Sequence, residues 1–238
     1  MIGGWKAKRF WQDVSVAQDA GGFAVMLDTR RVLTPGKQPL ILPTPAMARA
    51  VAAEWAAQDG EIKPLTMPVT RAANSAIERV RPQRAEVAAM LAAYAETDLT
   101  CHRAAGPAEL VARQAQAWDP LLDWAATAHG APLIPTTGVL PVDQPPDSLR
   151  ALADHVAALG EFHLTALHDL VTLSGSLLLG LATSARHLDP ETAWALSRID
   201  EEWQIEHWGR DEDADAAMEI KRAQFLQADA FWTMCAAD

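Results

Sequence analysis

Short apolar runs separated by turn-forming residues dominate the chain up to about residue 43. Two runs, FAVML at residues 23–27 and PLILP at residues 39–43, have the length of strands, and Val14 and Val16 alternate with polar residues ahead of them. Turn chemistry separates the runs at residues 21–22, 28–29 and 35–36. The pattern predicts a small antiparallel sheet. No strand–helix–strand alternation follows, so we do not expect a parallel nucleotide-binding sheet.

From residue 44 onward the apolar positions take helical spacing. Thr44 and Pro45 form a typical helix start, as the N-cap and the first helical residue, and Gly60 is suited to end the element. Similar apolar periodicity covers residues 87–94 and 111–125. Pro120 lies inside the second stretch, so we expect a break there, with Asp119 capping a new helix that Gly130 closes.

The second half of the chain also reads as helical after a proline-rich loop at residues 131–146. Apolar periodicity predicts four further helices, at residues 147–159, 162–183, 191–207 and 212–234. The expected fold class is therefore α+β. We expect a small β-rich N-terminal domain at residues 1–65 and a larger, all-helical C-terminal domain at residues 66–238.

Composition narrows the possible functions. Half of the residues are hydrophobic, as in globular proteins, and the formal net charge is −11. Such a charge argues against affinity for nucleic acid or anionic lipid and favours a basic or amphipathic protein partner. The longest apolar run, residues 170–182, is shorter than the ~20 residues that a spanning helix needs, so membrane insertion is not expected. Two cysteines and the absence of a signal-peptide pattern suit a cytoplasmic protein.

Motifs for catalysis are weak. The sequence contains neither a P-loop nor a G-x-S-x-G elbow, and we interpret Gly175 and Gly180 as small residues that let an apolar helix pack closely. Asp98, Cys101 and His102 could belong to a metal- or thiol-dependent enzyme, which stays open as an alternative. Neighbouring residues point apart in regular structure, and no second ligand pair completes a zinc site. We therefore expect no enzyme activity and no cofactor.

Tryptophan and acid crowd the segment IDEEWQIEHWGRDEDAD at residues 199–215. If residues 190–207 form one helix, ~100° per residue places Leu196, Ile199 and Trp203 on a core-facing side. The same rotation forms a second stripe around Glu201, made of Trp194, Ile205 and Trp208. Glu201 could pair with an arginine across a helix contact, or it could orient a basic partner on an exposed apolar stripe. The acids at 211–215 favour the N-terminus of the next helix.

Several motifs in order resemble a known family: KRFW, LDTRRVLTP, AEW, MPVTRAAN, TDLTCHRA, QAQAWDPLLDW and DEEWQIEHWGRDEDA. Together they extend over nearly the whole chain. The chain resembles the assembly chaperones that act on the α subunit of F1-ATP synthase. The resemblance implies a non-enzymatic chaperone that holds unassembled α subunit until β subunit arrives. It also implies a β-rich N-terminal domain and a helical C-terminal domain, in agreement with the periodicity.

The resemblance also suggests where the partner binds. In the family an acid of the DEEWQ segment matters, which is Glu201 or Glu202 here, and the helical wheel favours Glu201. The expected partner-binding residues are Trp194, Glu201, Glu202, Gln204, Ile205 and Trp208. His102 stands where the family would have tyrosine, and without a transit peptide a bacterial cytoplasmic homologue is expected. A scaffold that binds helical peptides through Trp194 and Trp208 stays open as an alternative.

Overall fold

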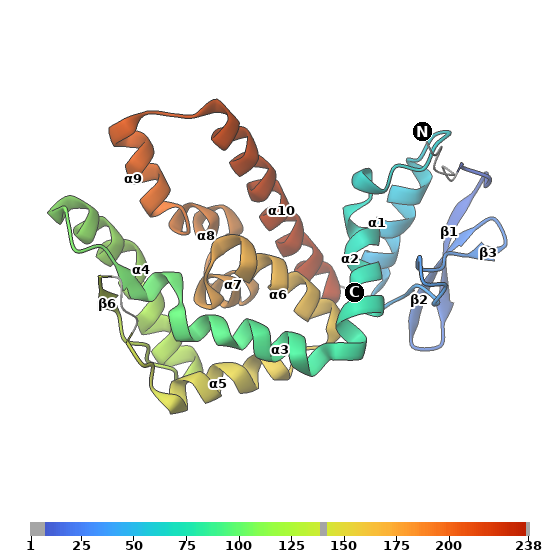
Figure 1. Ribbon diagram of the computed structural model, residues 1–238. Helices are drawn as coiled ribbons and strands as arrows, with labels where there is room; N and C mark the ends of the chain where they lie inside the picture. The colour runs from blue at the N-terminus through green and yellow to red at the C-terminus, as the bar shows by residue number, and fades with distance from the viewer. Residues whose placement is uncertain (1–7, 139–141, 237–238) are drawn as a thin grey trace. The chain divides into compact units, whose positions relative to one another are not determined.

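The structure is a computed structural model that describes residues 8–138 and 142–236 (Figure 1). Its α+β class confirms the prediction, with a four-stranded sheet near the N-terminus and a mostly helical remainder that includes one short strand pair. The chain forms two compact units. The first comprises residues 1–83, 161–165 and 230–238, and the second comprises residues 84–160 and 166–229. The division therefore falls at residue 83, later than the expected boundary at residue 65, and the first unit takes in two short stretches of later sequence.

The predicted antiparallel sheet is present in the first unit. Strand β1 (Val14–Asp19) pairs along its whole length with β2 (Gly22–Leu27), and β2 also pairs with β3 (Arg30–Arg31) and β4 (Ile41–Leu42). The buried residues of β2 and β4 face a helix that packs on β1 and β2 (Figure 1). The sheet is thus a one-sided layer whose apolar face a single helix covers.

Helix α1 (Pro45–Ala56) begins as the sequence predicts. The Thr44 hydroxyl accepts a hydrogen bond from the Met47 amide at 3.2 Å, and Pro45 is the first helical residue. Glu54 near its end accepts the Val69 and Thr70 amides at 2.7 and 2.8 Å, which ties α1 to the start of α2 (Pro68–Ser75). Short helical turns flank α2: Pro64–Thr66, Ala76–Val80 and Arg81–Gln83.

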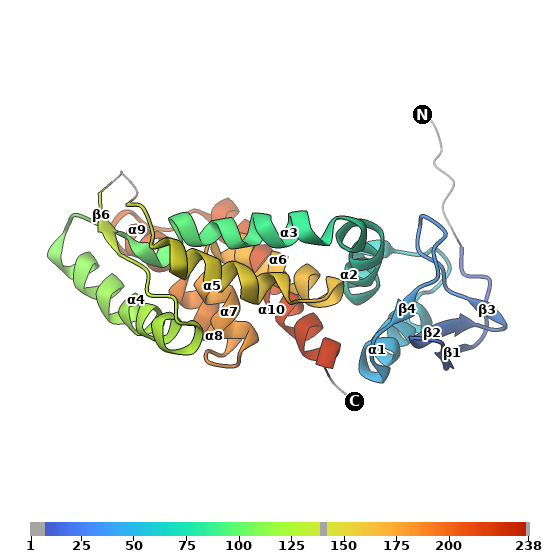
Figure 2. The same ribbon diagram turned by 90° about the horizontal axis from the view of Figure 1, so that it is seen from below.

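The second unit is a helical assembly. Its helices, with the parts of α6 and α10 that belong to the first unit, are α3 (Arg84–Ala92), α4 (Ala108–His129), α5 (Pro146–Ala157), α6 (Glu161–Ser174), α7 (Leu177–Ser184), α8 (Pro190–Leu196), α9 (Ile199–Trp208) and α10 (Glu212–Ala236). Helices α3 and α5 lie side by side (Figure 2). Turns at Ala93–Thr97 and Leu99–Cys101 lead into β5 (His102–Arg103), which pairs in parallel with β6 (Thr136–Thr137). Trp118 and Phe225 are the largest fully buried side chains of the core, to which α4, α6, α7, α8, α9 and α10 contribute.

Three expected helix boundaries were wrong. Pro120 does not break α4, because Pro120 and Gln116 are both exposed and water can satisfy the carbonyl that loses its amide partner. The helix expected at residues 162–183 divides at Gly175, which adopts φ of +76° and ends α6. Gly175 does not serve close packing as expected, because a Cβ there would meet no atom within 4 Å. Ser176 then caps α7 by accepting the Leu179 amide at 3.0 Å.

The helix expected at residues 191–207 also divides. Helix α8 ends at Leu196, where the Ser197 hydroxyl donates to the Trp194 carbonyl at 2.7 Å. Arg198 leaves helical geometry with φ of −114° and ψ of 13°, and α9 begins at Ile199. The expected core-facing side is nevertheless confirmed, because Ile199 belongs to the hydrophobic core and Leu196 and Trp203 pack against it. The second expected stripe joined residues of α8 and α9 as one helix, so it does not describe the structure. Within the described residues, no helix has the length and apolarity that crossing a membrane requires.

Candidate functional site

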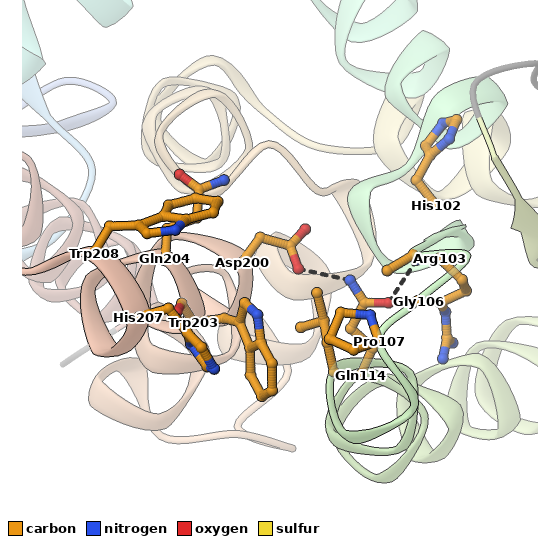
Figure 3. Close-up of a pocket in the computed structure, with 12 residues that line it drawn as sticks. His102, Arg103, Gly106, Pro107, Gln114, Asp200, Trp203, Gln204, His207 and Trp208 are labelled. Atoms are coloured by element: carbon orange, nitrogen blue, oxygen red, sulfur yellow. Dashed lines mark hydrogen bonds between the residues drawn. The ribbon is translucent and has the colours of Figure 1, made fainter.

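A pocket of about 580 Å³ opens on the second unit, between α9 and the segment that leads from β5 into α4 (Figure 3). One wall is formed by the side chains of α9. The other consists of residues from His102 to Pro107 together with Leu110 and Gln114 of α4. Two regions that the sequence singled out separately, TDLTCHRA and the tryptophan-rich acidic segment, thus face each other across one pocket.

Helix α9 turns aromatic and polar side chains toward the pocket. Asp200, Trp203, Gln204, His207 and Trp208 all line it, and they fall within roughly 140° of the helix circumference at ~100° per residue. Trp203 is half-buried and stacks on His207, with ring centroids 4.2 Å apart. Trp208 is 80% exposed at the end of the helix. An exposed tryptophan, which has the largest side chain of all residue types, is typical of a surface that a partner covers.

Gln114 connects the two walls. Its side chain is almost fully buried, its Oε1 accepts the Ala104 amide at 2.8 Å, and its Nε2 donates to Asp200 Oδ1 at 2.6 Å (Figure 3). Because the side-chain amide accepts through its oxygen and donates through its nitrogen, it fixes the loop after β5 relative to α9. The floor of the pocket is therefore held in place without a bound partner.

Arg103 is the guanidinium among the pocket residues, and its charge is already compensated. It pairs with Asp119 at 2.8 Å, donates through Nε to the Thr100 carbonyl at 2.9 Å, and lies 5.4 Å from the ring centroid of Trp118. Figure 3 shows its side chain directed away from Asp200. Arg103 thus stabilises the wall, and among residues 8–138 and 142–236 no cation pairs with the Asp200 carboxylate.

The family can be assigned from comparisons with known proteins. The family model described as ATP12 chaperone protein matches residues 8–126. The crystal structure of Atp12 from Paracoccus denitrificans is 55% identical, with a TM-score of 0.94 over 96% of this chain and 98% of that one. The chain belongs to the ATP12 chaperone family. This confirms the resemblance to the F1-ATP synthase assembly chaperones, and the chain is an assembly chaperone of the F1-ATPase.

Further relatives agree with the assignment. A variant of the P. denitrificans protein, with lysine in place of an aspartate, is 54% identical, with a TM-score of 0.94 over 96% of this chain and 98% of that one. The Atu1473 protein from Agrobacterium tumefaciens is 38% identical, with a TM-score of 0.91 over 95% of this chain and 85% of that one. The mitochondrial protein atp12 of Schizosaccharomyces pombe is 21% identical over 87% of this chain and 75% of its own length.

The expected stripe of Trp194, Ile205 and Trp208 does not exist in this ATP12-family chain. Trp194 is only 6% exposed and packs on Phe225, because the interruption at residues 197–198 turns α8 away from the face of α9. Trp203, expected on the core-facing side, does pack against the core and also lines the pocket. Gln204 and Trp208 line it as well, whereas half-buried Ile205 does not.

The two candidate glutamates lie outside the pocket. Glu201 accepts a hydrogen bond from Arg198 at 2.8 Å, and the Arg198 guanidinium also lies over the Trp194 ring at 5.1 Å. This resembles the arginine-paired interpretation, but the arginine precedes α9 and does not come from a separate packed helix. Glu202 is half-buried and lies on the side of α9 away from the pocket at ~100° per residue. Glu201 lies on the same side of α9 as Trp208 at ~100° per residue, but about two turns (~10 Å) earlier along the helix.

At the alternative site, Asp98 and Cys101 are both buried, whereas His102 is directed to the pocket. Burial raises the pKa of the Cys101 thiol to about 12, so no thiolate is present at neutral pH. Burial also raises the pKa of Asp98, although Ser176, Leu178 and Thr100 all donate hydrogen bonds to its carboxylate. Among residues 8–138 and 142–236, no three His, Cys, Asp or Glu side chains come together as metal ligands. His102 lines the pocket instead.

Sequence reasoning missed Asp200, His207 and Gln114 as pocket residues. Asp200 and His207 were not among the expected partner-binding residues, and Gln114 carried no signal beyond its place in a family motif. Their roles depend on the contact between α4 and α9. In this contact Gln114 meets Asp200, which lies 86 positions further along the chain. Helical periodicity describes only the face of one helix, so it cannot identify which distant segment lies opposite.

Proposed function

We propose that this chain binds the unassembled α subunit of the F1-ATPase and shields the surface that later contacts the β subunit. The supporting observation is Trp208, which is 80% exposed at the rim of a pocket that aromatic residues and the carboxylate of Asp200 line. Glu201, Glu202, Gln204 and Ile205 of α9 complete the proposed contact region. Trp194 is omitted because it is buried. The proposed location is the bacterial cytoplasm, where F1 subunits are made.

The physical requirements of such a chaperone match this surface. Obligate interfaces between subunits are large and apolar, so an unassembled subunit exposes a surface that tends to aggregate. A protecting protein needs exposed aromatic area for affinity and charge for orientation, and it must still dissociate when the permanent partner arrives. A single exposed tryptophan with neighbouring acids provides a contact of moderate size that a larger permanent interface can displace.

A pull-down tests the proposal against its main alternative. The tagged chain is incubated with a bacterial lysate that contains F1 subunits, and the bound proteins are identified by mass spectrometry. We expect the F1 α subunit to be the dominant partner, with β subunit competing for it. Capture of many unrelated proteins without enrichment of α subunit would contradict the proposal and favour a general scaffold for helical peptides.

A further inference from the structure

We infer that the pocket between α9 and the β5–α4 segment receives an arginine side chain of the client protein, with Asp200 as its counter-ion. The identity of the client, the F1 α subunit, rests on the proposed function. The chemistry of the bound group rests on the pocket alone. Three features of the pocket carry the inference: its uncompensated charge, its aromatic surfaces and its size.

The charge that remains in the pocket is negative. Asp200 uses Oδ1 to accept from Gln114, which leaves Oδ2 without a partner among the residues that the structure describes. The surrounding charges are paired with one another: Arg103 with Asp119 at 2.8 Å, and Arg113 with Glu206 at 2.8 Å. A half-buried carboxylate with a free oxygen favours a cationic hydrogen-bond donor over a neutral one.

The aromatic surfaces suit a planar cation. Trp203 has His207 stacked on one side, and Trp208 is exposed at the mouth of the pocket. Guanidinium groups are bound on tryptophan faces, where the ring quadrupole attracts the cation. His207 Nδ1 lies 2.8 Å from the Trp203 carbonyl, which can only accept, so the neutral ring carries its proton on Nδ1 and offers Nε2 as an acceptor.

Size and shape distinguish an arginine side chain from a small ion. The pocket volume of about 580 Å³ exceeds what one guanidinium occupies and leaves room for an aliphatic stem. Pro107 and Leu110 line the wall opposite α9 and provide apolar contact for such a stem. The bound group is therefore an arginine presented on a protein segment, whose neighbouring residues contact Trp208.

The test removes the charge of Asp200 and keeps its shape. In Asp200→Asn the amide oxygen can still accept from Gln114, so the fold should be retained. We expect the variant to bind purified F1 α subunit about tenfold more weakly, since one charge-assisted contact is lost. The matched control is Asp154→Asn, an exposed aspartate on α5 outside the pocket, which should bind as wild type does.

A small probe examines the pocket without the client. N-acetyl-arginine amide is titrated into the full chain, and the indole N–H resonances of Trp203 and Trp208 are followed by NMR, with N-acetyl-citrulline amide as the neutral comparison. We expect shifts with the arginine probe only, and none with Asp200→Asn. The lysine analogue should shift these resonances less, because an ammonium cannot stack as a planar group.

The outcomes separate this inference from the proposed function. If wild type and Asp200→Asn bind α subunit equally and the two probes act alike, the arginine site is wrong and the proposed function stands. If the chain does not bind α subunit but its indole resonances shift with the arginine probe alone, the proposed function is wrong and the cation site stands. Failure of both binding experiments overturns both.

Discussion

At the residue scale, Trp208 is the feature that packing within the chain does not explain. Its side chain is 80% exposed, whereas Trp118 and Trp194 are buried in the core of the same unit. Leaving so large an apolar surface in water forgoes the free energy that burial would supply. The exposed position is therefore best understood through contact with another protein.

Replacing Trp208 with alanine should separate binding from folding. Because the side chain buries little area within the chain, we expect the free energy of unfolding to change by less than about 0.5 kcal/mol. Loss of an aromatic anchor should weaken binding of α subunit by about 2 kcal/mol. Denaturant unfolding and titration calorimetry measure the two quantities. Leu65→Ala, which truncates an 82% exposed side chain of the first unit, is the control and should change neither.

Cys101 illustrates the opposite case, a reactive residue type that the fold makes inert. Burial raises the pKa of its thiol to about 12, and the nearby carboxylate of Asp98 adds to the shift. At about pH 8 the native thiol should therefore resist a thiolate-specific reagent and react only after denaturation. Cys235, whose thiol pKa burial also raises to about 12, should behave in the same way. Rapid labelling of native Cys101 would reopen the thiol-enzyme alternative.

At the scale of elements, the sequence predicted what short-range patterns control. The sheet, the Thr44 cap of α1 and the end of α4 at Gly130 were all predicted from the sequence, because turn residues and caps act within a few positions. The division of two long helices was not, although Gly175 held the signal for one of them. The junction at residues 197–198 carries no glycine or proline, so tertiary packing decides it.

Short-range sequence patterns were also insufficient to predict how the site is assembled. The sequence drew attention to α9 and to the segment around His102, but periodicity could not bring them together. The buried Gln114 determines their contact, and its partner Asp200 is distant in sequence. The wheel that favoured Trp194 and excluded Trp203 assumed one continuous helix. Because α8 and α9 are separate, Trp194 is buried, whereas Trp203 packs against the core as expected and also lines the pocket.

Gly180 gives a prediction about how α6 and α7 pack. A Cβ added there would lie 2.8 Å from Val171 Cγ2 and 3.3 Å from Leu167 Cδ1, which confirms that a small residue permits the close approach. Gly180→Ala should lower the free energy of unfolding by about 1–3 kcal/mol. Combining it with Val171→Ala should relieve part of that cost, giving a measurable coupling in a double-mutant cycle. Additive costs would contradict the packing interpretation.

At the scale of the whole molecule, the net charge of −11 acts on the rate of encounter. An acidic chaperone whose pocket retains a free carboxylate should attract a basic client surface over distances of about one Debye length, ~10 Å at 0.1 M salt. We expect the association rate with α subunit to fall as salt is added, with a smaller change in the dissociation rate. Stopped-flow fluorescence measures both. An association rate that does not depend on salt would contradict electrostatic steering.

The most direct test of the central claim is protection of the α subunit from aggregation. Purified α subunit is diluted from denaturant, and light scattering is followed with the wild-type chain or with Glu201→Lys, which reverses a charge on the same side of α9 as Trp208. The account predicts that wild type suppresses scattering at stoichiometric amounts and that the variant, folded by circular dichroism, protects poorly. Equal protection by the two chains would show that the α9 surface does not bind the client, and no protection by wild type would contradict the proposed function itself.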